Sequence, residues 1–144
     1  MPTKPRLLQI ASLLLLGLGG GFAVGLLLAP FDFHIYSVNN QTMGGRQFAD
    51  TVGLPIGLMS VTFCIAGWGL LRNRTWARRA SLVAVACLGF TSSWVTAIAP
   101  GGHILAPHLV ATRLFVGIAA WYLYFARGPK AYFAALADAE RSGA

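Results

Sequence analysis

The chain has 144 residues, of which 56% are hydrophobic and only 10% are charged, and its mean hydropathy is +0.65. A soluble domain carries about 25% charged residues, so this composition excludes an ordinary water-soluble domain. The net charge of +7 does not indicate nucleic-acid binding, because the sequence lacks a basic stripe with interleaved exposed aromatic residues. We therefore expect membrane lipids, and not nucleic acid, among its partners.

Four apolar stretches are each long enough to cross a bilayer, which requires a helix of about 20 mostly apolar residues. The sequence therefore predicts an all-α membrane protein: one domain whose four transmembrane helices form an up-down bundle, followed by a short C-terminal interfacial helix. The predicted spans are residues 7–29, 52–71, 77–99 and 105–126, with an outer loop at 30–51 and an inner tail at 127–144.

The first stretch carries Gly17, Gly21 and Gly25, whose four-residue spacing places them on one helix face. Small residues in this pattern let a neighbouring backbone come close. The contact is made either within the bundle or with a partner helix or second copy, and the sequence does not separate the two. The stretch begins like a signal peptide, but its apolar run through Leu28 exceeds the 7–15 residues of a signal core. We expect a retained helix.

The outer loop and the start of the second span contain two local signals. A β-rich run from Ile35 to Met43 with Asn39-Asn40 at its centre predicts a small hairpin, because Asn tolerates the left-handed turn conformation. In the second span, Gly53 and Gly57 again permit close helix packing.

Basic residues gather at alternate ends of the spans. Only Arg46 lies on the outer side, and only Arg113 lies within a span. By the positive-inside rule, both termini and the central turn face the cytoplasm, where cations also meet anionic lipid headgroups. The inner basic residues are Lys4, Arg6, Arg72, Arg74, Arg78, Arg79, Arg127, Lys130 and Arg141.

The inner tail predicts one more helix. Pro129 suits a first helical turn, and apolar Tyr132, Phe133 and Leu136 are interspersed with charged residues. An amphipathic helix on the inner membrane surface fits this pattern.

Two segments of the second half carry a resemblance. The pattern Arg-x-Arg-x-Trp-Ala-Arg-Arg at 72–79 and the aromatic-rich run at 122–133 resemble those of small four-span proteins of bacterial inner membranes. The resemblance implies a location in the bacterial plasma membrane and implies no activity.

Arg113 is the most unusual residue, since it lies eight residues after Leu105, which is about 12 Å along a helix. A charge within the hydrocarbon is costly and marks a functional candidate by default. Three interpretations stay open. Its side chain extends outward to Asp50, Asp32 or a lipid phosphate; it pairs with an acidic group of a partner subunit; or it holds an anionic or carbonyl-bearing ligand such as a quinone headgroup.

Other polar residues of the outer side form a second candidate group. Three histidines, His34, His103 and His108, all fall there and supply side chains that bind copper, zinc or haem. Their spacing matches no metal motif, which favours interfacial histidines bonded to backbone or water. Ser93 and Thr96 line a polar patch beside them, although such hydroxyls most often bond back to helix carbonyls.

These features favour a non-catalytic integral membrane protein, an accessory or assembly subunit of a larger complex, over an enzyme. The alternative is an outer-leaflet ligand-binding or redox-linked protein that binds a quinone, lipid or metal through Arg113, His103 and His108. A small anion transporter ranks third, because the spans contain no carboxylate. The cofactor stays open, since a pigment or quinone held by apolar contacts leaves no motif.

Overall fold

The computed structural model describes residues 4–31, 36–38, 41–98 and 106–142. Within these ranges the chain is almost entirely helical, which confirms the predicted all-α class. Its elements are α1 (Arg6–Leu28), the 3-10 turn η1 (Ala29–Phe31), β1 (Tyr36–Val38), β2 (Gln41–Met43), α2 (Gly45–Leu71), α3 (Ala77–Ile98), α4 (Ala106–Phe125) and α5 (Arg127–Arg141).

Two helical segments of the described chain are long and apolar enough to cross a membrane. These are Arg6–Phe31 and Gly45–Leu71. Helix α4 has 20 residues, and the part whose side chains are described, Val110–Phe125, is apolar. Helix α3 is less apolar because it combines two arginines in its first turn with several hydroxyl residues. By length and composition alone, two helices therefore qualify as membrane spans.

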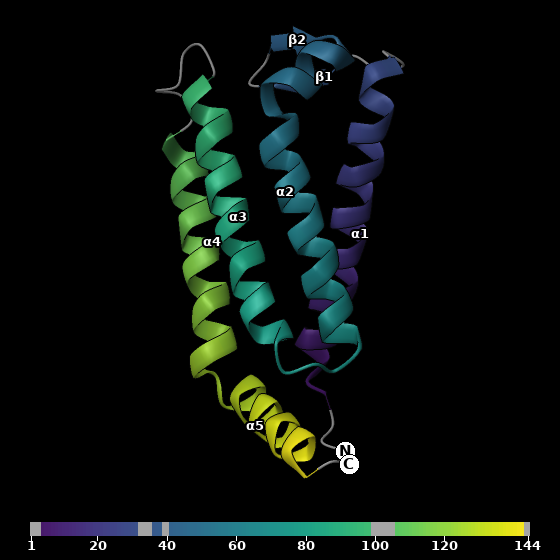
Figure 1. The fold of residues 1–144 in the computed structure, drawn as a ribbon. Helices are drawn as coiled ribbons and strands as arrows, with labels where there is room; N and C mark the ends of the chain where they lie inside the picture. Colours follow the sequence, from purple (N-terminus) through teal and green to yellow (C-terminus); the bar gives the residue numbers. More distant parts are fainter. Residues whose placement is uncertain (1–3, 32–35, 39–40, 99–105, 143–144) are drawn as a thin grey trace.

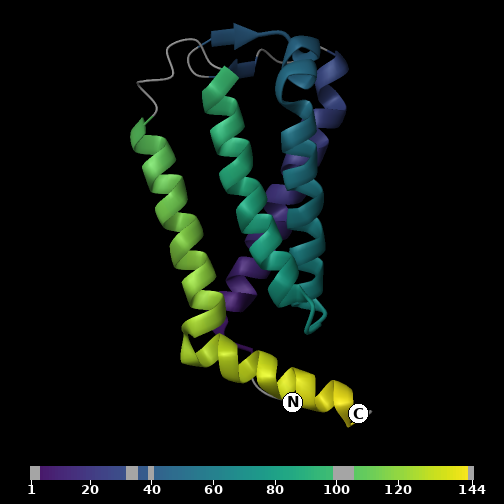
Figure 2. The same ribbon diagram turned by 60° about the vertical axis from the view of Figure 1, so that its left-hand side comes forward.

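The helices pack in chain order, α1 on α2, α2 on α3, α3 on α4 and α4 on α5. Figures 1 and 2 show an open row whose helices converge beside α5 and separate toward the hairpin end. The up-down order is as predicted, but the row does not close into the predicted bundle, because α1 and α4 are not an extensive pair. Buried side chains that join α2 to α3, such as Phe63 and Ala84, lie between the middle of α2 and the α5 end.

Glycine allows α1 and α2 to approach closely at two points. A Cβ atom at Gly19 would lie 2.8 Å from Cys64 Sγ and 2.9 Å from the Ser60 carbonyl oxygen. A Cβ atom at Gly67 would lie 2.9 Å from the Ser12 carbonyl oxygen. The Ser60 hydroxyl also donates a hydrogen bond to the Gly19 carbonyl at 2.6 Å. Small residues thus bring the two backbones into contact, as in other membrane helix pairs.

The glycine face predicted on α1 is not the one that packs within the chain. In the described chain, a Cβ atom built at Gly17, Gly21 or Gly25 has no heavy atom within 4 Å other than those of its own stretch of helix. Gly19 makes the contact instead, and a residue two positions away points to nearly the opposite side of a helix with 3.6 residues per turn. The face at Gly17 and Gly21 is therefore exposed along α1.

The glycines predicted to pack in α2 make only ordinary contacts. Built Cβ atoms at Gly53 and Gly57 would lie 3.8 Å and 3.7 Å from Leu26, which is van der Waals distance. A larger side chain at either position would meet α1, whereas a methyl group would be accommodated. These two glycines thus permit the helix pair without being its closest approach.

A tight turn at 72–76 joins α2 to α3, as predicted. Asn73 adopts a left-handed conformation with φ of 53°. The backbone N–H of Arg74 donates to the Gly69 carbonyl at 3.0 Å, and the backbone N–H of Asn73 donates to the Leu70 carbonyl at 3.2 Å. This is the Schellman arrangement that satisfies the last carbonyls of a helix. The Trp76 ring lies over Gly69, where a Cβ atom would come within 2.6 Å of it.

The predicted hairpin is confirmed. Strands β1 and β2 pair antiparallel, with Tyr36 opposite Met43 and Val38 opposite Gln41. The predicted turn residues, Asn39 and Asn40, lie outside the described residues. The hairpin covers the end of the row that is opposite α5 (Figure 1).

We expect the substitution Gly67→Ala to destabilise the helix pair, because its methyl group would approach the Ser12 carbonyl oxygen at 2.9 Å. Overpacking of this kind typically costs about 1–3 kcal/mol. Gly21→Ala is the matched control, since its methyl group meets no neighbour and Ala favours a helix by about 1 kcal/mol over Gly. Thermal unfolding of both variants in detergent, followed by circular dichroism, measures the difference. Equal midpoints would contradict the close approach at Gly67.

Candidate functional site

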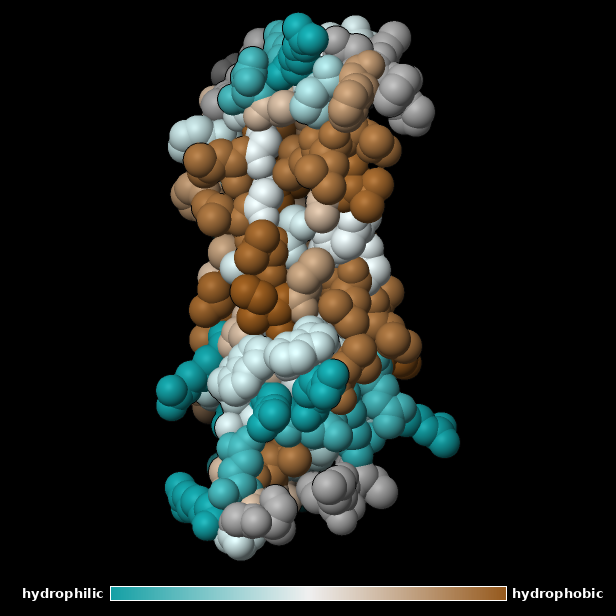
Figure 3. All heavy atoms as spheres, turned by 45° about the vertical axis from the view of Figure 1, so that its right-hand side comes forward, coloured by the Kyte–Doolittle hydropathy of each residue, from teal (hydrophilic) through white to brown (hydrophobic). Residues whose placement is uncertain are grey.

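Exposed apolar side chains cover the helices between two polar ends (Figure 3). The large exposed hydrophobic residues of the described chain lie on α1 to α4 and the segments adjoining them, and none lies on α5. Leu54 in α2 is 76% exposed, and Phe125 at the end of α4 is 73% exposed. Monomeric soluble proteins rarely expose apolar patches on this scale, whereas a lipid-facing surface requires them.

Arg113 lies on the exposed side of α4, seven residues after its first residue. No hydrogen bond or ion pair joins it to the described residues. Side chains of a helix lean toward its N-terminus, so the guanidinium group of Arg113 leans toward the hairpin end. The Cα atom lies roughly 10 Å from that end of α4. This geometry favours the outward-extending arginine among the three predicted interpretations.

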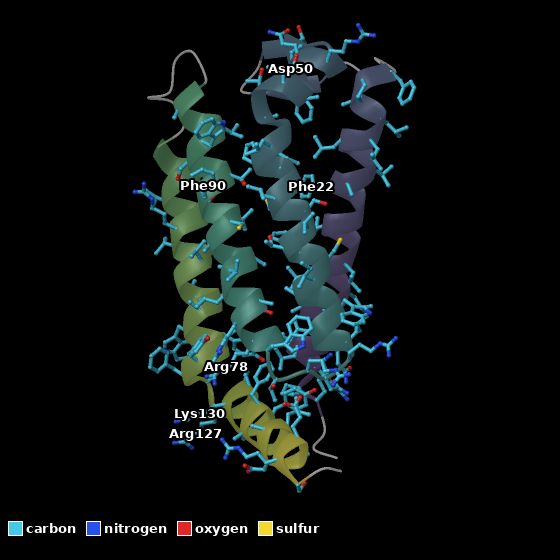
Figure 4. All side chains as sticks on the ribbon, in the orientation of Figure 1. Phe22, Asp50, Arg78, Phe90, Arg127 and Lys130 are labelled. Carbon is cyan, nitrogen blue, oxygen red and sulfur yellow. The ribbon has the colours of Figure 1, made fainter. Side chains whose placement is uncertain are left out.

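Asp50, the predicted partner of Arg113, is not brought near it. Asp50 lies in α2 at the hairpin end of the structure (Figure 4). Helix α3 separates α2 from α4 in the row. Arg113 is 12 residues from the end of α4, and Asp50 is 21 residues from the end of α2. At about 1.5 Å per residue, their heights along the row differ by roughly 13 Å.

The predicted polar patch is only partly described. The Ser93 hydroxyl donates to the carbonyl of Gly89 in its own helix at 2.9 Å, as is common for serine in helices. The Ser92 hydroxyl reaches Thr112 in α4 at 3.4 Å and so links the two helices. His34 and His103 lie outside the described residues, as do the side chains of Thr96 and His108. Among the residues that are described, no three His, Cys, Asp or Glu side chains gather into a metal site.

An apolar groove of about 260 Å³ lies between α2 and α3. Its walls include Leu58 and Phe90, and the Cys87 side chain lines it. Beside it, the Thr91 hydroxyl donates to the Pro55 carbonyl at 3.1 Å and joins the two helices. Such a groove accepts an apolar chain, and it offers almost no polar group to orient a ligand.

The larger of the two buried hydrophobic clusters in the described chain lies where α5 turns beneath the other helices (Figure 2). Every helix contributes at least one buried side chain to it. We call it the inner junction. Its buried residues are Leu8 of α1, Leu70 of α2, Ala77 of α3, Leu123 of α4, and Tyr132 and Phe133 of α5.

Arg78 of α3 closes the end of α4 at this junction (Figure 4). Its Nε atom donates to the Leu123 carbonyl at 3.1 Å, and Nη2 donates to the Tyr124 carbonyl at 3.3 Å. The guanidinium group also lies 4.0 Å from the centre of the Tyr124 ring and 5.9 Å from that of Phe133. The last carbonyls of a helix lack partners and carry negative partial charge, so a cation satisfies them well.

Lys4 caps the carbonyl end of α2 in the same way. Its Nζ atom donates to the Leu70 carbonyl at 2.6 Å. Partial burial lowers the pKa of the Lys4 amine below its ordinary value, because the charged form loses solvation. Two of the inner cations that indicate orientation in the sequence, Lys4 and Arg78, are therefore also helix caps.

Helix α5 is held on the chain by two further hydrogen bonds. The Tyr132 hydroxyl donates to Asn73 Oδ1 at 2.7 Å, and burial raises the pKa of this hydroxyl. The Thr75 hydroxyl donates to Glu140 Oε2 at 2.8 Å. The predicted amphipathic helix is thus confirmed, but its apolar side, including Phe133, packs on the other helices and not on the bilayer. Apolar residues at the converging ends of α1 to α4 offer it that surface.

Comparisons with known proteins give no relative. No family model matches the chain, and no curated protein or solved structure matches it. The two segments that carry the resemblance to small four-span proteins, 72–79 and 122–133, meet in the inner junction, where Arg78 stacks on Tyr124. Their shared place in the fold explains why basic and aromatic residues occur in both.

We expect Arg78→Gln to loosen the inner junction, because Gln cannot keep both hydrogen bonds and the stacking on Tyr124. Hydrogen bonds to charged groups contribute about 1.5–3 kcal/mol each at most, and partial exposure of Arg78 reduces this, so we expect a loss of about 1–3 kcal/mol. The neighbouring Arg79→Gln removes an equal charge from an exposed residue and is the control. Unfolding in detergent measures both, and a loss of the same size in the control would contradict the role of Arg78.

Proposed function

We propose that α1 to α4 all cross the plasma membrane of a bacterium, with both termini in the cytoplasm. Support comes from exposed apolar residues of α3 and α4, the two helices that are not identified as spans by length and composition alone. These residues include Phe90 of α3 and Leu114 and Ile118 of α4. These helices lie alongside α2 between the same two polar ends (Figures 1 and 3). Leaving them in water would expose a large apolar surface.

The orientation is supported by the charges and aromatic rings of the α5 end. Nine of the eleven Lys and Arg residues lie there, against two acidic residues, Asp138 and Glu140. Exposed Trp68, Trp76 and Trp121 lie at the same end of α2, α3 and α4. Cations facing the cytoplasm with an adjacent tryptophan belt are typical of inner-membrane proteins.

Cysteine labelling tests this topology. In a variant with Cys64→Ala and Cys87→Ala, we expect Thr42→Cys and Gly102→Cys to react with an impermeant maleimide in intact spheroplasts. Ser142→Cys should react only after permeabilisation, because it follows α5. If Gly102→Cys were also protected, only α1 and α2 would cross the membrane. Labelling of Ser142→Cys alone in intact spheroplasts would reverse the orientation.

We infer that the protein is a non-catalytic accessory or assembly subunit of a larger membrane complex. The observation that carries this inference is the open row of helices. Within the described ranges, α2 is the one spanning-length helix on which α1 packs extensively, and α3 is the one on which α4 does. The exposed face of α1 also carries Gly17 and Gly21, where a partner backbone can come close.

Purification from native membranes tests this role. We expect the tagged protein to retain larger membrane subunits in a fixed ratio, identified by mass spectrometry. The variant Gly17→Leu with Gly21→Leu should lose them, because its side chains fill an exposed face on which a Cβ atom at either position meets no neighbour in the described chain. Val61→Ala with Ile65→Ala, which makes α2 smaller at two exposed positions away from this face of α1, is the control. A wild-type protein that purifies alone would overturn the inference.

A further inference from the structure

Two cations at the elbow between α4 and α5 have no partner in the described part of the chain. Arg127 and Lys130 lie three residues apart on α5, both exposed, below the end of α4 (Figure 4). Residues at this spacing are neighbours on a helix surface, and like charges there repel each other. No carboxylate lies three or four residues from either cation. An anion from outside the chain would relieve this repulsion.

Three other cations of the same end are already engaged. Arg78 binds two carbonyls of α4. Arg72 lies over the Trp68 ring at 5.4 Å, and Arg141 lies 4.0 Å from a carboxylate oxygen of Asp138. The elbow differs from these sites because its two cations are adjacent and neither stacks on a ring nor meets a carboxylate in the described structure.

Exposed aromatic side chains adjoin the elbow. The last two turns of α4 present Trp121, which is 59% exposed, and Phe125, which is 73% exposed. Aromatic rings of this kind lie at the level of lipid headgroups, with their apolar part toward the acyl chains. At the elbow, an apolar surface is thus followed by a pair of cations. A phospholipid has the matching order, with apolar acyl chains followed by a phosphate.

We propose that the elbow binds an anionic phospholipid of the cytoplasmic leaflet. Arg127 and Lys130 contact its phosphate, while Trp121 and Phe125 lie beside its glycerol and acyl region. This proposal rests on the proposed membrane placement of α4. The aromatic surface is what selects a phospholipid over a free phosphate ion, which would gain nothing from it.

Fluorescence quenching by brominated lipids tests the proposal. A protein with Trp68→Phe, Trp76→Phe and Trp94→Phe retains Trp121 as its single tryptophan, and circular dichroism checks its fold. We reconstitute it in vesicles that contain equal fractions of dibrominated phosphatidylglycerol or dibrominated phosphatidylcholine. One basic residue near an anionic surface is worth about fivefold in binding, so we expect at least about a fivefold preference of the Trp121 site for phosphatidylglycerol.

Two variants of this protein separate the elbow from general charge. In Arg127→Gln with Lys130→Gln, the preference should fall to about one. In Arg72→Gln with Arg74→Gln, which removes the same charge from the α2–α3 turn, it should persist. Loss of the preference for phosphatidylglycerol in both variants alike would overturn the proposal. Loss of that preference when inorganic phosphate is added at constant ionic strength would also overturn it.

The outcomes also distinguish the two proposals. Equal quenching of Trp121 by both lipids would overturn the lipid site and leave the four-span topology intact. If neither lipid quenched Trp121, the end of α4 would lie outside the bilayer, and the four-span topology would be overturned as well.

Discussion

The caps on the carbonyl ends of α2 and α4 hold the five helices of this protein together. Both ends point toward α5, so their negative partial charges gather at one end of the molecule. Lys4, which lies just before α1, and Arg78 of α3 meet those charges, which ties the start of α1 to α2 and α3 to α4. Without Arg78, the Leu123 and Tyr124 carbonyls would lose the side-chain hydrogen bonds that compensate their burial, whereas the Leu70 carbonyl would keep the backbone amide of Asn73. Tyr132 and Phe133 can pack there because those ends already converge.

The same constraint explains why the opposite end is open. The tight turn at 72–76 and α5 fix the helix axes at one end, and beyond the apolar cluster of Met59, Phe63, Ala66 and Ala84 the buried Thr91–Pro55 hydrogen bond still joins α2 to α3. In water an open row would be unstable, because its apolar surfaces would collapse together. In a bilayer there is no such driving force between helices, since lipid chains are as apolar as leucine. An open row is thus compatible with lipid, and partner helices with small residues at the contact would gain most by packing on it.

Local patterns in the sequence predicted much of this fold. The Asn-rich hairpin, the tight turn after α2 and the amphipathic α5 each depend on neighbouring residues, so a local pattern is enough to find them. The glycine face on α1 left two interpretations open, packing within the bundle or against a partner, and the contacts within the chain are made by Gly19 instead. Glycine spacing shows where a backbone can come close, and only the neighbouring helix decides that Gly19 faces Ser60 while Gly17 does not.

The candidate site was harder to predict, for a related reason. Arg113 and Asp50 seemed suitable partners by charge and side of the membrane, but the unequal lengths of α2 and α4 separate their heights. Arg78 looked like one orientation signal among nine, and its two carbonyl partners are 45 and 46 residues away in sequence. Such a contact depends on helix lengths and crossings, which no local pattern records.

Some basic residues of the α5 end have two roles, as orientation signals in the sequence and as caps of helix ends. The second role helps to make the α5 end more tightly packed than the hairpin end. A charge that only sets orientation needs to remain on the cytoplasmic side, and Lys would then serve as well as Arg. Arg78 must also span two carbonyls and lie flat over an aromatic ring, which the planar guanidinium group does and an ammonium group does not. Orientation and packing thus place different demands on the same row of positive charges. Arg78 meets both demands, whereas Arg127 and Lys130 contribute only charge within the described chain and make no hydrogen bond or ion pair there.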